Sequence, residues 1–229
     1  HGVDTARAVL LTDLSTWAEQ LAAAGYATGA IVNGSELSAK FGFDQGFGDF
    51  VNVPPARIAG VPESVMALSW FKLGTLALGA VLTPSVRRSY RPVDDVLADA
   101  RAFMAHHRER PWALFVHLMD THAPYFEHPS LSGTGPELFG AALGDARRDE
   151  AVDRPDRTRA LYRGEVALVD DRLSRLFDWL QSAGLYDRTL VVLTSDHGEG
   201  LGEHGDWWHG MSLHEEQTRV PLLLKLPRN

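Results

Sequence analysis

The sequence predicts an α/β fold, a three-layer α/β/α sandwich built around a mixed, mostly parallel sheet. Two observations support this prediction. Uninterrupted apolar runs alternate along the chain with segments of helical periodicity, and parallel strands of this kind are normally covered on both faces by helices. Polar clusters directly follow three of the apolar runs, and parallel α/β sheets bind their ligands beyond such strand ends. With 45% hydrophobic residues in 229, the chain can bury a substantial core.

Three helices are predicted from apolar residues that recur at helical spacing. The first covers residues 14–24, where Thr16 and Glu19 have the spacing of a capping box. The second covers residues 93–107. The third covers residues 159–182 and has the most regular apolar face of the three.

Strands are predicted at residues 26–32, 112–118, 190–194 and 221–226 from short apolar runs. Residues 41–50, "FGFDQGFGDF", are predicted to form a glycine–aromatic loop. If the strands are parallel, the polar clusters that follow the first three meet at one edge of the sheet. These clusters are Asn33-Gly34-Ser35, Asp120-Thr121-His122 and Ser195-Asp196-His197.

The whole chain, residues 1–229, is interpreted as one partial domain. A variable apolar insertion is expected at 54–90, and a long loop rich in glycine, proline and charge at 126–157. The apolar stretch 65–82 has the length of a short membrane span, but it contains Lys72 and several small polar residues. A helix packed on the domain or lining its cleft is therefore favoured over contact with a membrane.

The overall charge argues against a nucleic-acid partner. The formal net charge is −8, and basic residues cluster no further than in adjacent pairs such as Arg87 and Arg88. The chain has no cysteine, so it forms no disulfide and offers no thiolate nucleophile. The expected partner is a small molecule, for example a carbohydrate or lipid ester.

Asp196 and His197 are the first candidate metal ligands. Residues next to each other on a regular strand point to opposite faces, but at a strand end followed by Gly198 both can turn towards one ion. A carboxylate with an imidazole suits Mn²⁺ or Zn²⁺, and Mg²⁺ or Ca²⁺ where oxygen ligands dominate. An Asp-His-Gly alone is also typical of an ordinary loop with an Asx turn.

Further histidines follow strands or glycines. His122, in "MDTHAPY", comes directly after the second strand, and bonding to the local backbone is its alternative interpretation. His204, His209 and His214 recur at a spacing that matches no single helix face, so they are not expected to form a metal site alone. Glu199 is expected to lie on a solvated loop, as is Glu203.

Several of these segments together resemble the sulfatase family, within the alkaline-phosphatase-like metalloenzymes. The segment 189–227, "TLVVLTSDHGEGLGEHGDWWHGMSLHEEQTRVPLLLKLP", resembles the C-terminal core of that family. The segments 111–125, "PWALFVHLMDTHAPY", and 21–50 resemble two earlier parts of the same core. The resemblance covers nearly all of the chain except about residues 54–90 and 128–155.

The resemblance implies a role for each matching residue. Asp196 and His197 match the metal-binding pair of the family, and the implied cofactor is one divalent cation, with Ca²⁺ expected before Mg²⁺, Mn²⁺ or Zn²⁺. His122 matches the histidine that contacts the transferred ester group. His209 matches a position that contacts the sulfate or protonates the leaving oxygen. His122 and His209 are therefore the expected catalytic residues.

The chain also departs from the family pattern. Sulfatases carry their nucleophile, a formylglycine in many members, in a Cys/Ser-x-Pro-x-Arg segment shortly before a His-Gly-Val, and this chain begins with His1-Gly2-Val3. The nucleophile and an early aspartate pair are thus expected outside these residues, and the 229 residues alone are expected to be inactive. Many sulfatases have Gly-Lys-x-His where this chain has residues 32–35, "VNGS".

These features predict that the parent protein is a divalent-metal-dependent hydrolase of sulfate esters. The alternatives are a phosphomonoesterase, phosphodiesterase or phosphoglycerol-type transferase on the same scaffold, and a family member that binds a ligand without turnover. The missing basic pair in "VNGS" keeps the choice between sulfate and phosphate open.

Overall fold

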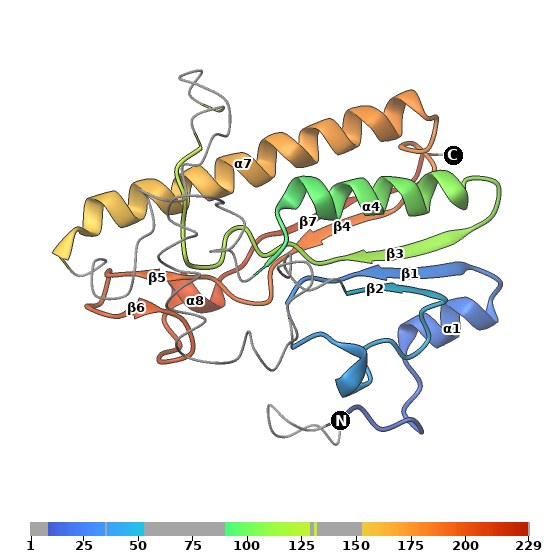
Figure 1. The fold of residues 1–229 in the computed structure, drawn as a ribbon, viewed down its shortest axis with the longest axis horizontal. Coiled ribbons are helices and arrows are strands. Elements are labelled where there is room, and N and C mark those ends of the chain that lie inside the picture. Colours follow the sequence, from blue (N-terminus) through green and yellow to red (C-terminus); the bar gives the residue numbers. More distant parts are fainter. Residues whose placement is uncertain (1–8, 35, 53–89, 129–130, 132–152, 229) are drawn as a thin grey trace, which may run out of the picture. The chain divides into compact units, whose positions relative to one another are not determined.

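The computed structural model divides the chain into two units, His1–Asp120 and Thr121–Asn229. The residues that the structure describes are 9–34, 36–52, 90–128, 131 and 153–228. The helices and strands of both units are drawn in Figure 1.

The first unit is built on a parallel three-stranded sheet. β1 (Ala27–Ile31) is its central strand, with β2 (Asp49–Val51) on one side and β3 (Trp112–Val116) on the other. All five residues of β1 are buried, which explains why this strand reads as an unbroken apolar run. The strands predicted at 26–32 and 112–118 are confirmed. The prediction of a loop throughout 41–50 is wrong at its end, because residues 49 and 50 belong to β2.

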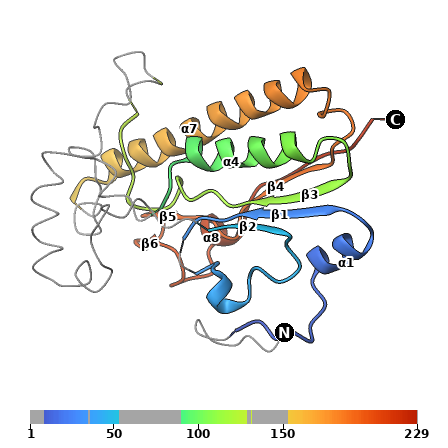
Figure 2. The ribbon, with the colours of Figure 1, turned by 45° about the vertical axis from the view of Figure 1, so that its right-hand side comes forward.

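Two helices cover this sheet. α4 (Val93–His106) lies on one side of the three strands and α1 (Trp17–Ala23) on the other, in both Figure 1 and Figure 2. The α4 side is packed closely, since a Cβ added to Gly29 of β1 would lie 2.4 Å from a ring carbon of Phe103. The predicted three-layer arrangement is therefore present in this unit, and the helices predicted at 14–24 and 93–107 are confirmed with small shifts of their ends.

The capping box predicted at the start of α1 is present. The backbone N–H of Glu19 donates to the Thr16 hydroxyl, and the backbone N–H of Thr16 donates to the Glu19 carboxylate at 2.8 Å. Each residue thus satisfies a donor that the first turn of a helix leaves unpaired. The carboxylate accepts a further bond from the side-chain amide of Gln45.

The second unit contains the longest helix, α7 (Pro155–Ser182), and an antiparallel pair of strands. β4 (Val191–Thr194) pairs with β7 (Leu222–Lys225) in a register that sets Val191 opposite Lys225. The predicted strands at 190–194 and 221–226 are confirmed. Their burial differs from the prediction of strands covered on both faces, because Val192 and the leucines of β7 are exposed and β4 pairs with β7 alone among the described residues.

The helix predicted at 159–182 begins four residues earlier, at Pro155. Proline suits the first turn of a helix, but with an aspartate and arginines around it the segment looks like a loop in the sequence. The predicted long loop at 126–157 is therefore wrong at 155–157, and most of the rest of it lies outside the described residues.

Three short elements of the second unit were not predicted. β5 (Gly200–Leu201) pairs antiparallel with β6 (Trp207–Trp208), and α8 (Glu215–Thr218) is a single helical turn. The predicted insertion at 54–90 lies outside the described residues except for Tyr90. In the described part of the chain, no helix combines the length and the apolar character that a membrane span needs.

Candidate functional site

The strand ends of the first unit carry buried polar side chains that bond to the backbone of another segment. Asn33, which follows β1, is 1% exposed; its side-chain nitrogen donates to Arg91 O at 2.7 Å and its side-chain oxygen accepts from Arg91 N at 2.8 Å. Asp120, which follows β3, is fully buried and accepts a bond from Val93 N, in the first turn of α4. Both side chains therefore hold α4 and the residues just before it against the sheet.

In the second unit, Asp196 and His197 follow β4 directly. The Asp196 side chain is 77% exposed and that of His197 is 38% exposed. The loop that carries them is bonded locally, since Ser195 Oγ donates to His197 O and the backbone N–H of His197 donates to the Asp196 carboxylate. The carboxylate and the imidazole end on the same side, with Asp196 Oδ2 lying 3.7 Å from His197 Nε2.

This pair fits two ligands of one divalent cation. Two atoms that each lie about 2.0–2.5 Å from an ion are separated by roughly 3–4 Å, and the 3.7 Å between Asp196 Oδ2 and His197 Nε2 falls in that range. His197 Nδ1 donates to Gly198 O at 2.7 Å, the bond that a metal-binding histidine usually makes with its other nitrogen. Within the described ranges, no group of three or more His, Asp or Glu side chains could hold a metal ion. The described residues thus offer Asp196 and His197 as two candidate ligands.

His209 lies directly against His197. Their rings stack with centroids 3.9 Å apart, and the ring of His122 meets that of His209 edge to face at 5.2 Å. His209 follows Trp208, whose backbone φ of 75° is rare for a residue with a side chain. The structure therefore brings together all four predicted site residues, Asp196 included.

The three imidazoles are held in the same way. His122 Nδ1 bonds to Ala123 O, His197 Nδ1 to Gly198 O and His209 Nδ1 to a carboxylate oxygen of Glu199. Carbonyl and carboxylate oxygens accept hydrogen bonds, so each Nδ1 carries a proton and each Nε2 is left for a ligand or substrate. This common arrangement is the main chemical feature of the cluster.

Glu199 departs from the expectation of a solvated loop residue. It is 9% exposed, and its carboxylate bonds to His209 Nδ1 at 2.9 Å and accepts the Tyr125 hydroxyl at 2.9 Å. Burial, followed by the nearby charge of Glu199, raises the pKa of Tyr125 far above its usual value. Local sequence gave no signal for this burial, because Tyr125 is distant along the chain.

A second buried carboxylate shapes the segment that carries His122. The side chain of Glu165, from the middle of α7, accepts a bond from Phe126 N at 2.6 Å and pairs with His128 Nε2 at 2.8 Å. Both members of this pair are buried. Residues 126–128 are thereby attached to α7, four residues beyond His122.

Gln217 joins the two loops of the candidate site. Its backbone carbonyl accepts Gly198 N at 2.8 Å, and its side-chain oxygen accepts Gly210 N at 3.0 Å. These glycines follow His197 and His209 directly. A Cβ at Gly198 would lie 2.0 Å from Glu216 O, so the α8 turn can pack here only against glycine.

The two other histidines of the loop are separate from the site. His204 and His214 stack with centroids 3.8 Å apart, and His204 Nδ1 bonds to Glu216 at 2.6 Å. This bond is the main reason that the pKa of Glu216 lies below its usual value. His204 and His214 therefore pair with each other, whereas His209 stacks on His197.

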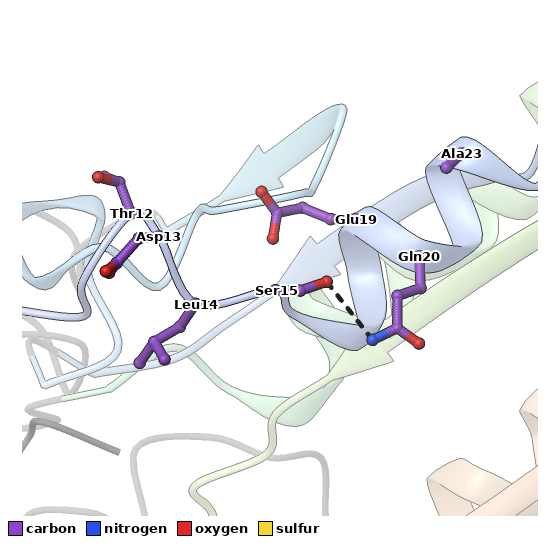
Figure 3. A pocket seen from close by; sticks show the side chains of 7 residues that line it. All are labelled: Thr12, Asp13, Leu14, Ser15, Glu19, Gln20 and Ala23. Atoms are coloured by element: carbon purple, nitrogen blue, oxygen red, sulfur yellow. Dashed lines mark hydrogen bonds between the residues drawn. The ribbon is translucent and has the colours of Figure 1, made fainter.

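A surface hollow of ≈ 380 Å³ lies beside α1 in the first unit and contains none of these residues. Its wall includes Ser15 and Gln20, whose side chains bond to each other at the start of the helix (Figure 3). The hollow is open to solvent and lacks a buried charged group, so it has no feature of a catalytic site.

The chain has recognisable relatives among known proteins. The sulfatase family model matches residues 8–229. The chain belongs to the sulfatase family. A multifunctional alkaline phosphatase superfamily protein, PehA of Trinickia caryophylli, is 38% identical over 91 residues, which are 40% of this chain and 17% of that protein. The N-acetylglucosamine-6-O-sulfatase of Bacteroides thetaiotaomicron is 40% identical over 67 residues, or 29% of this chain and 12% of the sulfatase.

Solved structures show the same fold at low sequence identity. A structure bound to its substrate D-glucosamine-2-N,6-O-disulfate matches with a TM-score of 0.62 and 16% identity, over 97% of this chain and 57% of its own. The phosphonate monoester hydrolase of Silicibacter pomeroyi matches with a TM-score of 0.57 and 18% identity, over 98% of this chain and 55% of its own. The sulfatase-family chain thus spans little more than half the length of these relatives, and its α/β fold is that of the alkaline-phosphatase-like enzymes.

Proposed function

We propose that the protein hydrolyses sulfate esters of small molecules with the help of one divalent cation. The observation that supports this most is the trio of imidazoles His122, His197 and His209, each held through Nδ1 and each with Nε2 left for a ligand. Membership of the sulfatase family gives the class of reaction. Because the chain spans little more than half the length of its solved relatives, the proposal concerns the activity of the whole protein.

Asp196 and His197 would hold the divalent cation. Their carboxylate and imidazole are partly exposed and separated by 3.7 Å, whereas the comparable polar side chains of the first unit are buried and bonded to backbone. When bound, such a cation supplies positive charge that stabilises the oxygens of the transferred sulfate group.

His122 and His209 act on the ester itself. With Nδ1 bonded to a backbone carbonyl, protonated His122 can donate only through Nε2, which makes it a donor to a sulfate oxygen. His209, whose Nδ1 is bonded to Glu199, likewise exchanges protons only through Nε2. A histidine held in this way suits the role of general acid, since one defined nitrogen meets the leaving oxygen.

The leaving step follows from these positions. A nucleophile attacks sulfur and forms a new bond to it, so that the sulfate group is transferred to the nucleophile. The bond between sulfur and the ester oxygen breaks, and its electron pair goes to that oxygen. Protonated His209 gives its Nε2 proton to the oxygen, the alcohol departs, and His209 is left neutral. Poor leaving groups need this proton most, because the negative charge that develops on their oxygen is least stable.

Phosphate or phosphonate monoesters are the second candidate substrates. Asn33 stands where, by the family resemblance, many sulfatases carry a lysine that holds sulfate, and its amide is bonded to the Arg91 backbone. The chain therefore lacks one feature of sulfate selectivity. A multifunctional phosphatase-superfamily protein is among its relatives, which is consistent with a broader choice of ester.

Turnover of aryl sulfates and aryl phosphates by the full-length protein tests the proposal. We expect His122→Ala and His209→Ala each to lower sulfate turnover by about a hundredfold or more. His106→Ala is the matched control, because His106 is an exposed histidine of the first unit. Faster turnover of phosphate than of sulfate would favour the second candidate. Equal turnover by wild type and both site variants would refute the assignment, and a protein inactive on every ester would be a binding member of the family.

A further inference from the structure

Glu199 links His209, the histidine proposed as the acid, to the buried aromatic residue Tyr125. Its side chain is 5% exposed, although its sequence neighbours Asp196 and His197 are open to solvent. One carboxylate oxygen accepts the Tyr125 hydroxyl and the other pairs with His209 Nδ1, both at 2.9 Å. A buried carboxylate is costly unless it is bonded in this way, so its retention here calls for a specific role.

We propose that Glu199, fixed by Tyr125, is the positioning residue of His209: it holds the proton on Nδ1 and directs Nε2 of the same ring to the substrate. The inference rests on the proposed function in taking His209 as the acid that protonates the leaving oxygen. Glu199 itself touches no reacting atom.

Tyr125 makes the position of the carboxylate definite. The phenol is fully buried, and its ring packs against Tyr162 at 5.4 Å and Trp208 at 5.8 Å between centroids. Tyr125 lies three residues after His122, while Trp208 comes directly before His209. The Tyr125–Glu199–His209 chain of bonds therefore ties together the two segments that carry the two catalytic histidines.

The backbone around His209 supports the same role. Trp208 adopts a positive φ, a strained conformation that persists only where the surroundings require it. Gly200, next to Glu199, approaches Trp208 so closely that a Cβ there would lie 2.8 Å from the Trp208 carbonyl oxygen. The β5–β6 pair thus brings the Glu199 carboxylate and the His209 ring together from residues ten positions apart.

The protonation state of each ring nitrogen tests positioning without any measurement of turnover. The full-length protein, labelled with ¹⁵N-histidine, is compared by long-range ¹H–¹⁵N correlation at a pH where His209 is neutral. We expect His209 to carry its proton on Nδ1 in wild type and to lose this signature in Glu199→Ala. Glu215→Gln is the matched control, because the Glu215 side chain is 85% exposed, and it should match wild type.

Turnover then separates positioning from a purely structural role. We expect Glu199→Ala to lower kcat for an aryl sulfate about tenfold or more, with little change in KM, and to act most strongly on poor leaving groups. Glu199→Gln should keep the Nδ1 proton and restore part of kcat, since the amide oxygen can still accept that bond. The loss caused by Glu199→Ala should disappear in a His209→Ala background, because both changes remove the same interaction.

Two results would overturn the inference: an unchanged Nδ1 signature in folded Glu199→Ala, or full additivity of the Glu199 and His209 changes. If Glu199→Ala fails to fold, Glu199→Gln and Tyr125→Phe replace it, and wild-type kcat in both would overturn the inference equally. The two proposals fail separately. Unchanged turnover in His209→Ala, combined with a signature that Glu199→Ala abolishes, would refute the role of His209 in catalysis and leave its positioning by Glu199 intact.

Discussion

The polar residues that follow the strands behave differently in the two units. After β1 and β3, Asn33 and Asp120 are buried, and the bonding atoms of their side chains accept from or donate to backbone near the start of α4. After β4, Asp196 and His197 are partly exposed, and their outer atoms face each other 3.7 Å apart. The same sequence pattern, an apolar run followed by polar residues, thus marks a structural clamp in one unit and a candidate reactive centre in the other.

The contrast shows which observation separates the two uses of a polar strand end. A clamp uses hydrogen-bonding atoms of its side chain on the protein's own backbone, and these bonds stabilise the packing of the segments that they join. A reactive residue keeps one atom free and uses the other to fix its direction, as the imidazoles of His122 and His209 do.

Removal of the Asp196 carboxylate should have the largest effect on ligand binding. We expect Asp196→Ala to weaken divalent-cation binding by at least about a hundredfold, since it removes one of the two proposed ligands. Calorimetric titration of the full-length protein with Ca²⁺ and Mn²⁺ measures this. The control is Asp206→Ala, an exposed aspartate of the same region, which should bind as wild type does. If Asp196→Ala bound the cation as tightly as wild type, the strand end of the second unit would not be a reactive centre and the contrast between the units would be wrong.

Loss of the Asn33 clamp should act on stability instead. Asn33→Ala leaves the backbone N–H and carbonyl of Arg91 without their side-chain partners, and we expect the free energy of unfolding to fall by about 1–3 kcal/mol. Urea unfolding gives this value, and cation affinity measured on the folded variant should stay unchanged. A variant of wild-type stability with altered substrate preference would show instead that Asn33 belongs to the reactive centre.

The capping box of α1 should give the smallest effect, a local dependence on pH. The backbone bond from Thr16, followed by the side-chain bond from Gln45, lowers the pKa of Glu19 below its ordinary value of 4.5. Because the folded-state pKa is depressed, the stabilising contribution is complete above pH 4.5 and is lost as the pH falls through the lowered pKa. The protection of the amides in the first turn of α1, corrected for the intrinsic pH dependence of hydrogen exchange, should fall over that range in wild type and change less in Glu19→Gln. Equal pH dependence in both would show that the carboxylate is not the cap.

The elements with strong local signals could be predicted from the sequence. The capping residues of α1, the periodic face of α7 and the buried run of β1 each depend on neighbours in the chain, and each is present. β2, β5 and β6 were missed because strands of two or three residues are too short to show a period. The start of α7 was placed too late because its first turn is polar.

The residues of the site could be named from the sequence, whereas their supports could not. Asp196, His197, His122 and His209 stand out by residue type and by family resemblance. The burial of Glu199 depends on the Tyr125 hydroxyl, 74 positions away in the sequence. This contact is made by the tertiary fold and not by neighbouring residues. Burial of a carboxylate by such distant partners leaves no trace in local composition.

The most direct test of the proposed function is aryl sulfate turnover by the full-length protein, measured against divalent-cation concentration for wild type and Asp196→Ala. We predict that wild-type turnover rises with the cation, is abolished by a chelator, and is absent in Asp196→Ala. Turnover that survives the chelator and is equal in the two proteins would contradict the claim that Asp196 and His197 hold a cation needed for the reaction.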